Sequence, residues 1–74
     1  MYVETIKYDQ YGLFVHVREE HANDGCYGYV IEDIESGKII NRENGYICIE
    51  GARNNGYVMA HSLALNRKLG YIKW

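Results

Sequence analysis

The sequence CYGYVIEDIESGKIINR, residues 26–42, predicts two strands joined by a tight turn. Side chains alternate along residues 26–34, with Tyr27 and Tyr29 on one face and Val30 on the other. Residues 35–38 read Glu-Ser-Gly-Lys, and Gly37 can supply the left-handed residue of a short hairpin loop. Residues 39–42 then pair back. This hairpin predicts an antiparallel sheet.

Two further strands are expected before the hairpin. Residues 13–17 alternate cleanly between apolar positions that face a core and positions on the opposite face. Residues 2–8 form the other strand, in which Tyr2 should share a face with Ile6. Residues 9–12 separate the two strands with a turn that ends on glycine.

Turn signals also follow and interrupt these strands. Residues 19–25 contain Asn-Asp-Gly at 23–25, which tolerates positive φ, so we expect a loop over residues 19–25. Residues 43–45 end in Asn-Gly, the pair favoured in type I′ turns, and predict a second hairpin. A last short strand would then cover residues 46–49. We therefore expect a meander of four to five antiparallel strands.

The remaining chain predicts one helix, from about residue 55 to 69, with Asn54 or Asn55 as its N-cap. Gly70 is suited to the left-handed position that ends many helices. Residues 71–74 should be a docked tail or an edge strand. The expected fold class is α+β, in one domain, with the C-terminal helix packed on a face of the sheet.

The predicted helix carries two apolar stripes. At about 100° per residue, Val58, Leu65 and Leu69 lie within ~40° of one another, whereas Met59 and Leu63 lie ~100° or more around the helix. One sheet face cannot easily cover both stripes. Either the C-terminal tail folds over the second stripe, or one stripe meets a target or a second copy of the chain, which would make a homodimer through the helix.

The charged residues are separated along the chain. Residues 1–50 hold all ten acids and four of the eight lysines and arginines, so their net charge is 4 − 10 = −6. Residues 51–74 hold the other four bases and no acid, a net charge of +4. A potential polarised in this way decides which partners approach which surface.

Six acids and no lysine or arginine lie between residues 19 and 35. If the loop and strand of this segment lie side by side, the acids form a negative surface next to tyrosines, which suit binding interfaces. Such carboxylates could occupy a basic groove on a partner, or they could only keep a sheet edge soluble. The predicted partner-binding residues are Glu19, Glu20, Asp24, Tyr27, Tyr29, Glu32, Asp33 and Glu35.

Direct nucleic-acid binding would need the basic residues after position 50, which are Arg53, Arg67, Lys68 and Lys73. Arg67 and Lys68 are also explained by the helix C-terminus, where cations interact favourably with the helix dipole. The strands belong to the segment of net charge −6, whereas phosphate contacts depend on lysine and arginine. We therefore favour this alternative less.

No spacing of cysteine and histidine indicates a metal site or a catalytic nucleophile, so we expect no metal, no cofactor and no enzymatic activity. Cys26 and Cys48 are too few for a disulfide scaffold, and Lys7 and Asp9 interrupt the opening apolar residues. We expect a cytoplasmic protein with reduced thiols. No stretch has the ~20 apolar residues of a membrane span.

These observations together predict a small non-enzymatic protein-binding module, such as an inhibitor or adaptor. Its partner would be a basic, nucleic-acid-handling protein, held by an acidic, tyrosine-bearing surface of the sheet. The alternatives are direct nucleic-acid binding through the C-terminal basic face and a self-associating structural protein.

Overall fold

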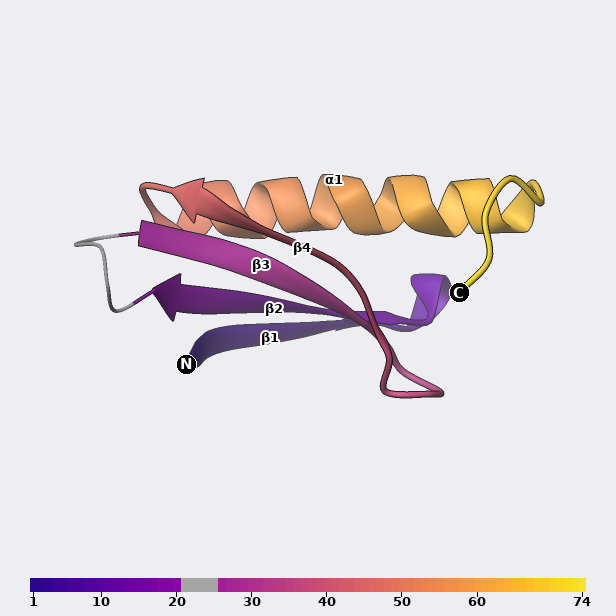
Figure 1. The fold of residues 1–74 in the computed structure, drawn as a ribbon, viewed down its shortest axis with the longest axis horizontal. Helices are drawn as coiled ribbons and strands as arrows, with labels where there is room; N and C mark the ends of the chain where they lie inside the picture. Colours follow the sequence, from indigo (N-terminus) through magenta and orange to yellow (C-terminus); the bar gives the residue numbers. More distant parts are fainter. Residues whose placement is uncertain (21–25) are drawn as a thin grey trace.

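The computed structural model describes residues 1–20 and 26–74. Four antiparallel strands form one sheet in the order β1-β2-β3-β4, and helix α1 covers one of its faces (Figure 1). The predicted α+β meander with a C-terminal helix is confirmed. The start of the loop predicted at residues 19–25 is wrong, because β2 continues to Glu20, and residues 21–25 lie outside the described residues. The elements are β1 (Tyr2–Tyr8), a short 3-10 helix η1 (Asp9–Tyr11), β2 (Leu13–Glu20), β3 (Cys26–Asp33), β4 (Ile39–Tyr46) and α1 (Ile49–Lys68).

The core lies between α1 and the two central strands. Leu13, Val15 and Val17 on β2 point towards the helix, as their alternation predicts. The register places Val15 opposite Ile31 and Val17 opposite Tyr29 on β3. All five side chains are buried, and each large apolar side chain removed from water contributes roughly 1.5 to 3 kcal/mol.

The helix approaches the sheet closely at Gly56. A Cβ atom on this residue would lie 2.7 Å from Val15 Cγ1 and 3.1 Å from Tyr29 Cβ. Ala52 and Ala60, one turn before and one turn after, are buried on the same face of α1. The sheet therefore covers a face made of small residues, because only small residues allow this approach.

The stripe of Val58, Leu65 and Leu69 points away from the sheet. The exposed fractions of these residues are 63%, 47% and 58%, respectively. Met59 and Leu63, the second predicted stripe, pack instead against the buried core. The sheet thus covers only one of the two stripes, as expected.

The C-terminal tail is docked and forms no edge strand. Trp74 packs against the core, and its indole Nε1 donates a hydrogen bond to Asp33 Oδ1 at 3.0 Å. The guanidinium carbon of Arg67 lies 4.3 Å from the centre of the indole ring. These contacts hold the tail across the end of the core.

The prediction of a second hairpin turn at residues 43–45 is wrong, because these residues belong to β4. Tyr27 pairs with Tyr46 but Gly28 pairs with Asn44, so Gly45 is the extra residue of a β-bulge, with φ 103°. A side chain on Gly28 would collide with Asn44, which is why glycine stands opposite the bulge. β4 therefore continues to Tyr46, and the sheet has four strands.

The helix begins six residues earlier than predicted, at Ile49 instead of residue 55. Its N-cap is Cys48, whose Sγ accepts a hydrogen bond from the Gly51 N–H at 3.3 Å. Asn55 lies inside the helix, where its side-chain amide donates to the Gly51 carbonyl. The early start is favoured because it buries Ala52 on the sheet, a tertiary contact that capping propensity alone does not reveal.

Two glycines occupy the left-handed positions that the sequence predicts. Gly37 has φ 75° in the loop between β3 and β4, and Gly70 has φ 82° directly after the helix. Tyr71 N–H donates to the Asn66 carbonyl across Gly70, which closes the helix end. Within the described residues, no helix is long and apolar enough to cross a membrane.

Gly56→Ala should lower the free energy of unfolding, which urea denaturation followed by circular dichroism measures. The new methyl group must displace Val15 and Tyr29, and overpacking of this kind costs roughly 1 to 3 kcal/mol, against ~1 kcal/mol gained in helix propensity. Gly51→Ala is the matched control, because its Cβ would meet Cys48 Sγ at an ordinary 3.5 Å. A Gly56→Ala variant at least as stable as the unsubstituted chain would contradict the close approach.

Candidate functional site

The sheet register collects acidic side chains and tyrosines at one end of the molecule. On the helix-facing side of the sheet, Glu19 lies opposite Tyr27, and Tyr27 lies opposite Tyr46. In the neighbouring row, Glu4 on β1 and Glu43 on β4 occupy the two edges. The first turn of α1 lies at this same end (Figure 1). We call this group the acidic end: Glu4, Glu19, Glu43 and Glu50, with Tyr27 and Tyr46, together with Glu20, which points to the opposite face of the sheet.

Two arginines lie among these carboxylates, and both are paired. Arg53 Nε donates to Glu4 Oε1 at 2.7 Å, and this hydrogen bond raises the pKa of the Arg53 guanidinium. Arg18 Nη1 lies 3.6 Å from Glu20 Oε1. With both arginines counted, the side-chain charge of the acidic end is −5 + 2 = −3. The end therefore keeps an excess of negative charge after its internal ion pairs.

The acids predicted to form one surface do not all lie together. Neighbouring residues of a strand point to opposite faces, so Glu32 and Asp33 are separated by the sheet. Glu20 pairs with Cys26 and Glu32 pairs with Phe14, which places these two acids about 20 Å apart along the strands. The expected single negative surface is therefore wrong for the described acids.

The other predicted partner-binding residues have different surroundings. Tyr29 is 1% exposed in the core, and burial raises the pKa of Tyr29 to about 12, so its hydroxyl stays neutral. Glu35 is exposed in the loop between β3 and β4, and Asp24 lies outside the described residues. Of the predicted set, the acidic end contains Glu19, Glu20 and Tyr27. Whether any of them contacts a partner stays a prediction.

Asp33 holds the chain in place at the opposite end of the sheet. Its Oδ2 accepts hydrogen bonds from the Ser36 backbone N–H at 2.9 Å and the Ser36 hydroxyl at 2.6 Å. Its Oδ1 accepts from the Trp74 indole. These hydrogen bonds, that of the Ser36 hydroxyl foremost, lower the pKa of the Asp33 carboxyl. Asp33 thus stabilises the hairpin loop and the docked tail.

His16 lies on the open face of the sheet, the one turned away from α1, yet it is only 7% exposed. Its Nε2 lies 2.7 Å from Glu32 Oε1 and its Nδ1 lies 2.8 Å from Thr5 Oγ1. Nε2 donates to the Glu32 carboxylate, and Nδ1 shares a hydrogen bond with the Thr5 hydroxyl. This chain of hydroxyl, imidazole and carboxylate fixes three strands to one another.

Tyr2 covers the imidazole of His16, and this position corrects the prediction for Tyr2. The register of β1 shifts between Tyr2 and Glu4, so Tyr2 pairs with Arg18 and points to the open face instead of sharing a face with Ile6. Its ring stacks on His16 with centres 4.3 Å apart and planes 7° from parallel. The alternation of side chains along residues 2–8 does not reveal this bulge. The pairing of Thr5 with His16, in contrast, follows when the two predicted strands are aligned from the turn between them.

The four basic residues after position 50 do not form one surface. Arg53 is paired at the acidic end, whereas Arg67 lies over Trp74 in the last turn of α1. Fourteen residues of helix separate these arginines, a distance of about 21 Å. Only Lys68 and Lys73 accompany Arg67 near the C-terminus, so the expected four-residue basic face is not assembled.

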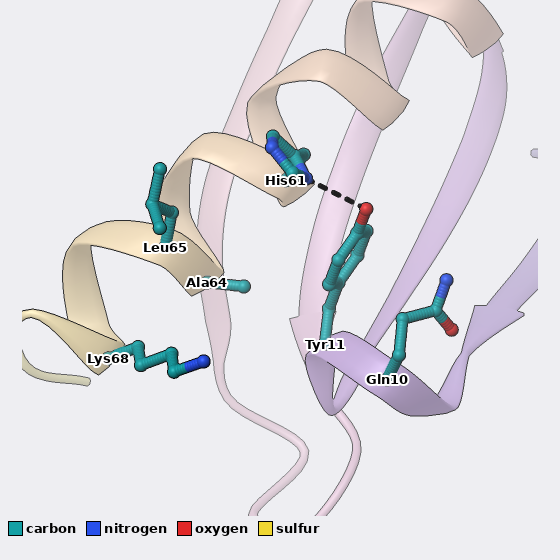
Figure 2. Close-up of a pocket in the computed structure, with 6 residues that line it drawn as sticks. All are labelled: Gln10, Tyr11, His61, Ala64, Leu65 and Lys68. Atoms are coloured by element: carbon teal, nitrogen blue, oxygen red, sulfur yellow. Dashed lines mark hydrogen bonds between the residues drawn. The ribbon is translucent and has the colours of Figure 1, made fainter.

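A small pocket opens between η1 and the C-terminal half of α1 (Figure 2). The Tyr11 hydroxyl lies 2.8 Å from His61 Nδ1 and 3.2 Å from the Tyr57 hydroxyl, and the latter bond raises the pKa of Tyr11. The volume of about 190 Å³ lies below that of typical ligand pockets, so the pocket suits a single side chain. Its lining residues are Gln10, Tyr11, His61, Ala64, Leu65 and Lys68.

No family model, curated protein or solved structure matches this chain. Within the described parts of the chain, no group of three or more histidine, cysteine, aspartate or glutamate side chains could hold a metal ion. Cys26 is half-buried and Cys48 is exposed, and both are free thiols. The surfaces described above are thus the basis for a functional conclusion.

Asp33→Asn should make stability less sensitive to acid. Because the pKa of Asp33 is lowered below its ordinary value of 3.8, the ionised carboxylate stabilises the folded chain above that pH, and this stabilisation is lost as the pH falls through the lowered pKa. The difference in unfolding free energy between the unsubstituted chain and the variant, measured by urea denaturation, should shrink towards low pH. A difference that stays constant from neutral to strongly acidic pH would contradict this role.

Glu32→Ala should lower the free energy of unfolding by about 1 to 3 kcal/mol, because it leaves the buried His16 without one of its hydrogen-bond partners. Glu35→Ala is the matched control, since Glu35 is exposed in a loop and should change stability by less than about 0.5 kcal/mol. Thermal or urea denaturation measures both. Equal stability of the two variants would show that the Glu32–His16 contact stabilises nothing.

Proposed function

We propose that this chain is a non-enzymatic protein-binding module that engages a cationic surface of a partner protein through its acidic end. The observation that carries this proposal is the sheet register, which places Glu19, Tyr27 and Tyr46 in one row next to Glu43. Carboxylates on a rigid sheet can receive arginine forks without losing much conformational freedom. An inhibitor or an adaptor would both use such a surface.

The charges of the acidic end suit recognition of a basic protein. Among the described residues, Glu19, Glu43 and Glu50 form no ion pair, so these three carboxylates can accept cations from a partner. The excess of negative charge speeds association with a positive surface and opposes association with a negative one. Electrostatic steering of this kind weakens as salt is added.

The two tyrosines supply contact area beside the carboxylates. Tyr27 and Tyr46 are half-buried. The Tyr46 hydroxyl donates to Glu43 Oε1 at 3.0 Å, and this hydrogen bond orients the side chains of Tyr46 and Glu43. Tyrosine adds a large, rigid contact surface at low cost in side-chain entropy. The combination of oriented tyrosine and carboxylate favours a specific protein partner over general charge attraction.

A nucleic-acid-handling protein is the partner class that this surface fits best. Such proteins expose lysine and arginine where they contact phosphates, and carboxylates can take the place of those phosphates. We place the interaction in the cytoplasm, because the free thiols of Cys26 and Cys48 suit a reducing compartment. Direct nucleic-acid binding by this chain is less favoured, because Arg53 and Arg67 are engaged within the molecule.

The double charge reversal Glu19→Lys/Glu43→Lys should abolish retention of the partner in affinity capture from the native host, followed by mass spectrometry of the retained proteins. The matched control Asp9→Lys/Glu35→Lys changes the net charge equally at exposed positions away from the acidic end and should retain the same basic protein. Added salt should release it. Equal retention by both double variants would contradict the proposal.

A filter-binding titration on DNA and RNA at two salt concentrations separates the proposal from direct nucleic-acid binding. The proposal predicts no binding at either concentration. Binding whose affinity falls steeply with salt would favour the basic residues of the C-terminal part instead.

A further inference from the structure

We infer that two copies of this chain associate through the exposed stripe of α1, with their helices antiparallel. The stripe consists of Val58, Leu65 and Leu69, which lie on the side of α1 opposite the buried Gly56 and Ala60. This inference is independent of the proposed function, because none of these residues belongs to the acidic end. The following observations name a second copy as the occupant and set its direction.

The two halves of the exposed helix face differ in size. Positions 51, 55, 58, 62, 65 and 69 follow the alternating spacing of four and three that makes a continuous seam along a helix. The C-terminal half of the seam carries the large residues Leu65 and Leu69. The N-terminal half carries Gly51 and Asn55, and the Asn55 amide is already hydrogen-bonded to the Gly51 carbonyl. In an antiparallel pair, large residues of one copy meet small residues of the other.

The charges of the two helix ends favour the same direction. α1 carries Glu50 in its first turn and Arg67 and Lys68 in its last turn, with Lys73 just beyond. An antiparallel pair places Glu50 of each copy close to Lys68 of the other and also opposes the two helix dipoles. A parallel pair would place Glu50 beside Glu50 and Lys68 beside Lys68, which repulsion disfavours.

The seam also fixes the register of the pair. In an antiparallel pair centred at the level of residue 60, Leu65 of each copy lies across from Asn55 of the other, and Leu69 lies across from Gly51. Val58, which is 63% exposed, then lies across from Ser62. Because both copies contribute the same contacts, the interface closes on itself and gives a dimer instead of a fibre.

Sedimentation equilibrium of the intact chain tests the association. A single helix face buries less than a standard interface, so we expect a dissociation constant of about 0.1 to 1 mM and an average mass that rises towards twice the chain mass over this range. Leu65→Glu should stay monomeric, because it buries a charge in the seam. Ile47→Glu is the matched control: Ile47 is 90% exposed and outside the stripe, so the variant should associate normally.

Disulfide formation tests the direction. In a Cys26→Ser/Cys48→Ser background, Asn55→Cys and Leu65→Cys chains are oxidised separately and as a mixture, and dimers are counted on a non-reducing gel. The antiparallel pair predicts that the mixture forms crosslinked heterodimers several-fold faster than either variant forms homodimers. Faster self-crosslinking by Leu65→Cys would overturn the antiparallel direction. The association itself would be overturned if the chain stays monomeric up to about 1 mM, or if the Leu65→Glu variant associates normally.

Discussion

The contact of Gly56 with Val15 and Tyr29 determines how the rest of this molecule is arranged. Because the helix can approach the sheet only along its small residues, Ala52, Gly56 and Ala60 must face inward. The direction of every other helix side chain follows from that choice. Met59 and Leu63 pack at the edge of the core, and the larger stripe that contains Leu65 turns to solvent.

The pleat and bulges of the sheet distribute the functional side chains. The pleat sends Glu32 to the open face, where it holds His16, and Asp33 to the opposite face, where it holds Trp74. The bulge at Gly45 lets β4 reach Tyr46, which completes the row at the acidic end. Five of the nine described acids thus lie where α1 starts, whereas Asp9, Glu32, Asp33 and Glu35 lie towards the other end of the sheet.

Local patterns were sufficient to predict the fold class, because alternation and turn chemistry depend on near neighbours. The strand at residues 2–8 and the left-handed Gly37 and Gly70 follow from such patterns. The bulges, the helix start at Ile49 and the His16 contacts could not be predicted in this way. Each of them depends on which residues of distant strands lie opposite one another, or on what the helix buries.

The candidate site was only partly predictable for the same reason. Glu19, Glu20 and Tyr27 were found from composition, but Glu43, Tyr46 and Glu50 join them only through the register and the place where α1 begins. Composition also suggested Tyr29 and Asp33, whose side chains turn out to stabilise the fold. A charge count shows that acids are abundant in a segment, whereas the pairing of strands decides which of them share a surface.

The most direct test of the proposed function is a nuclear magnetic resonance titration of the isotopically labelled chain with the captured partner. Binding through the acidic end predicts that the largest backbone amide changes fall in residues 17–20, 26–29 and 43–50. Changes concentrated on the open face around Thr5 and His16, or around Lys68 at the opposite end, would contradict it.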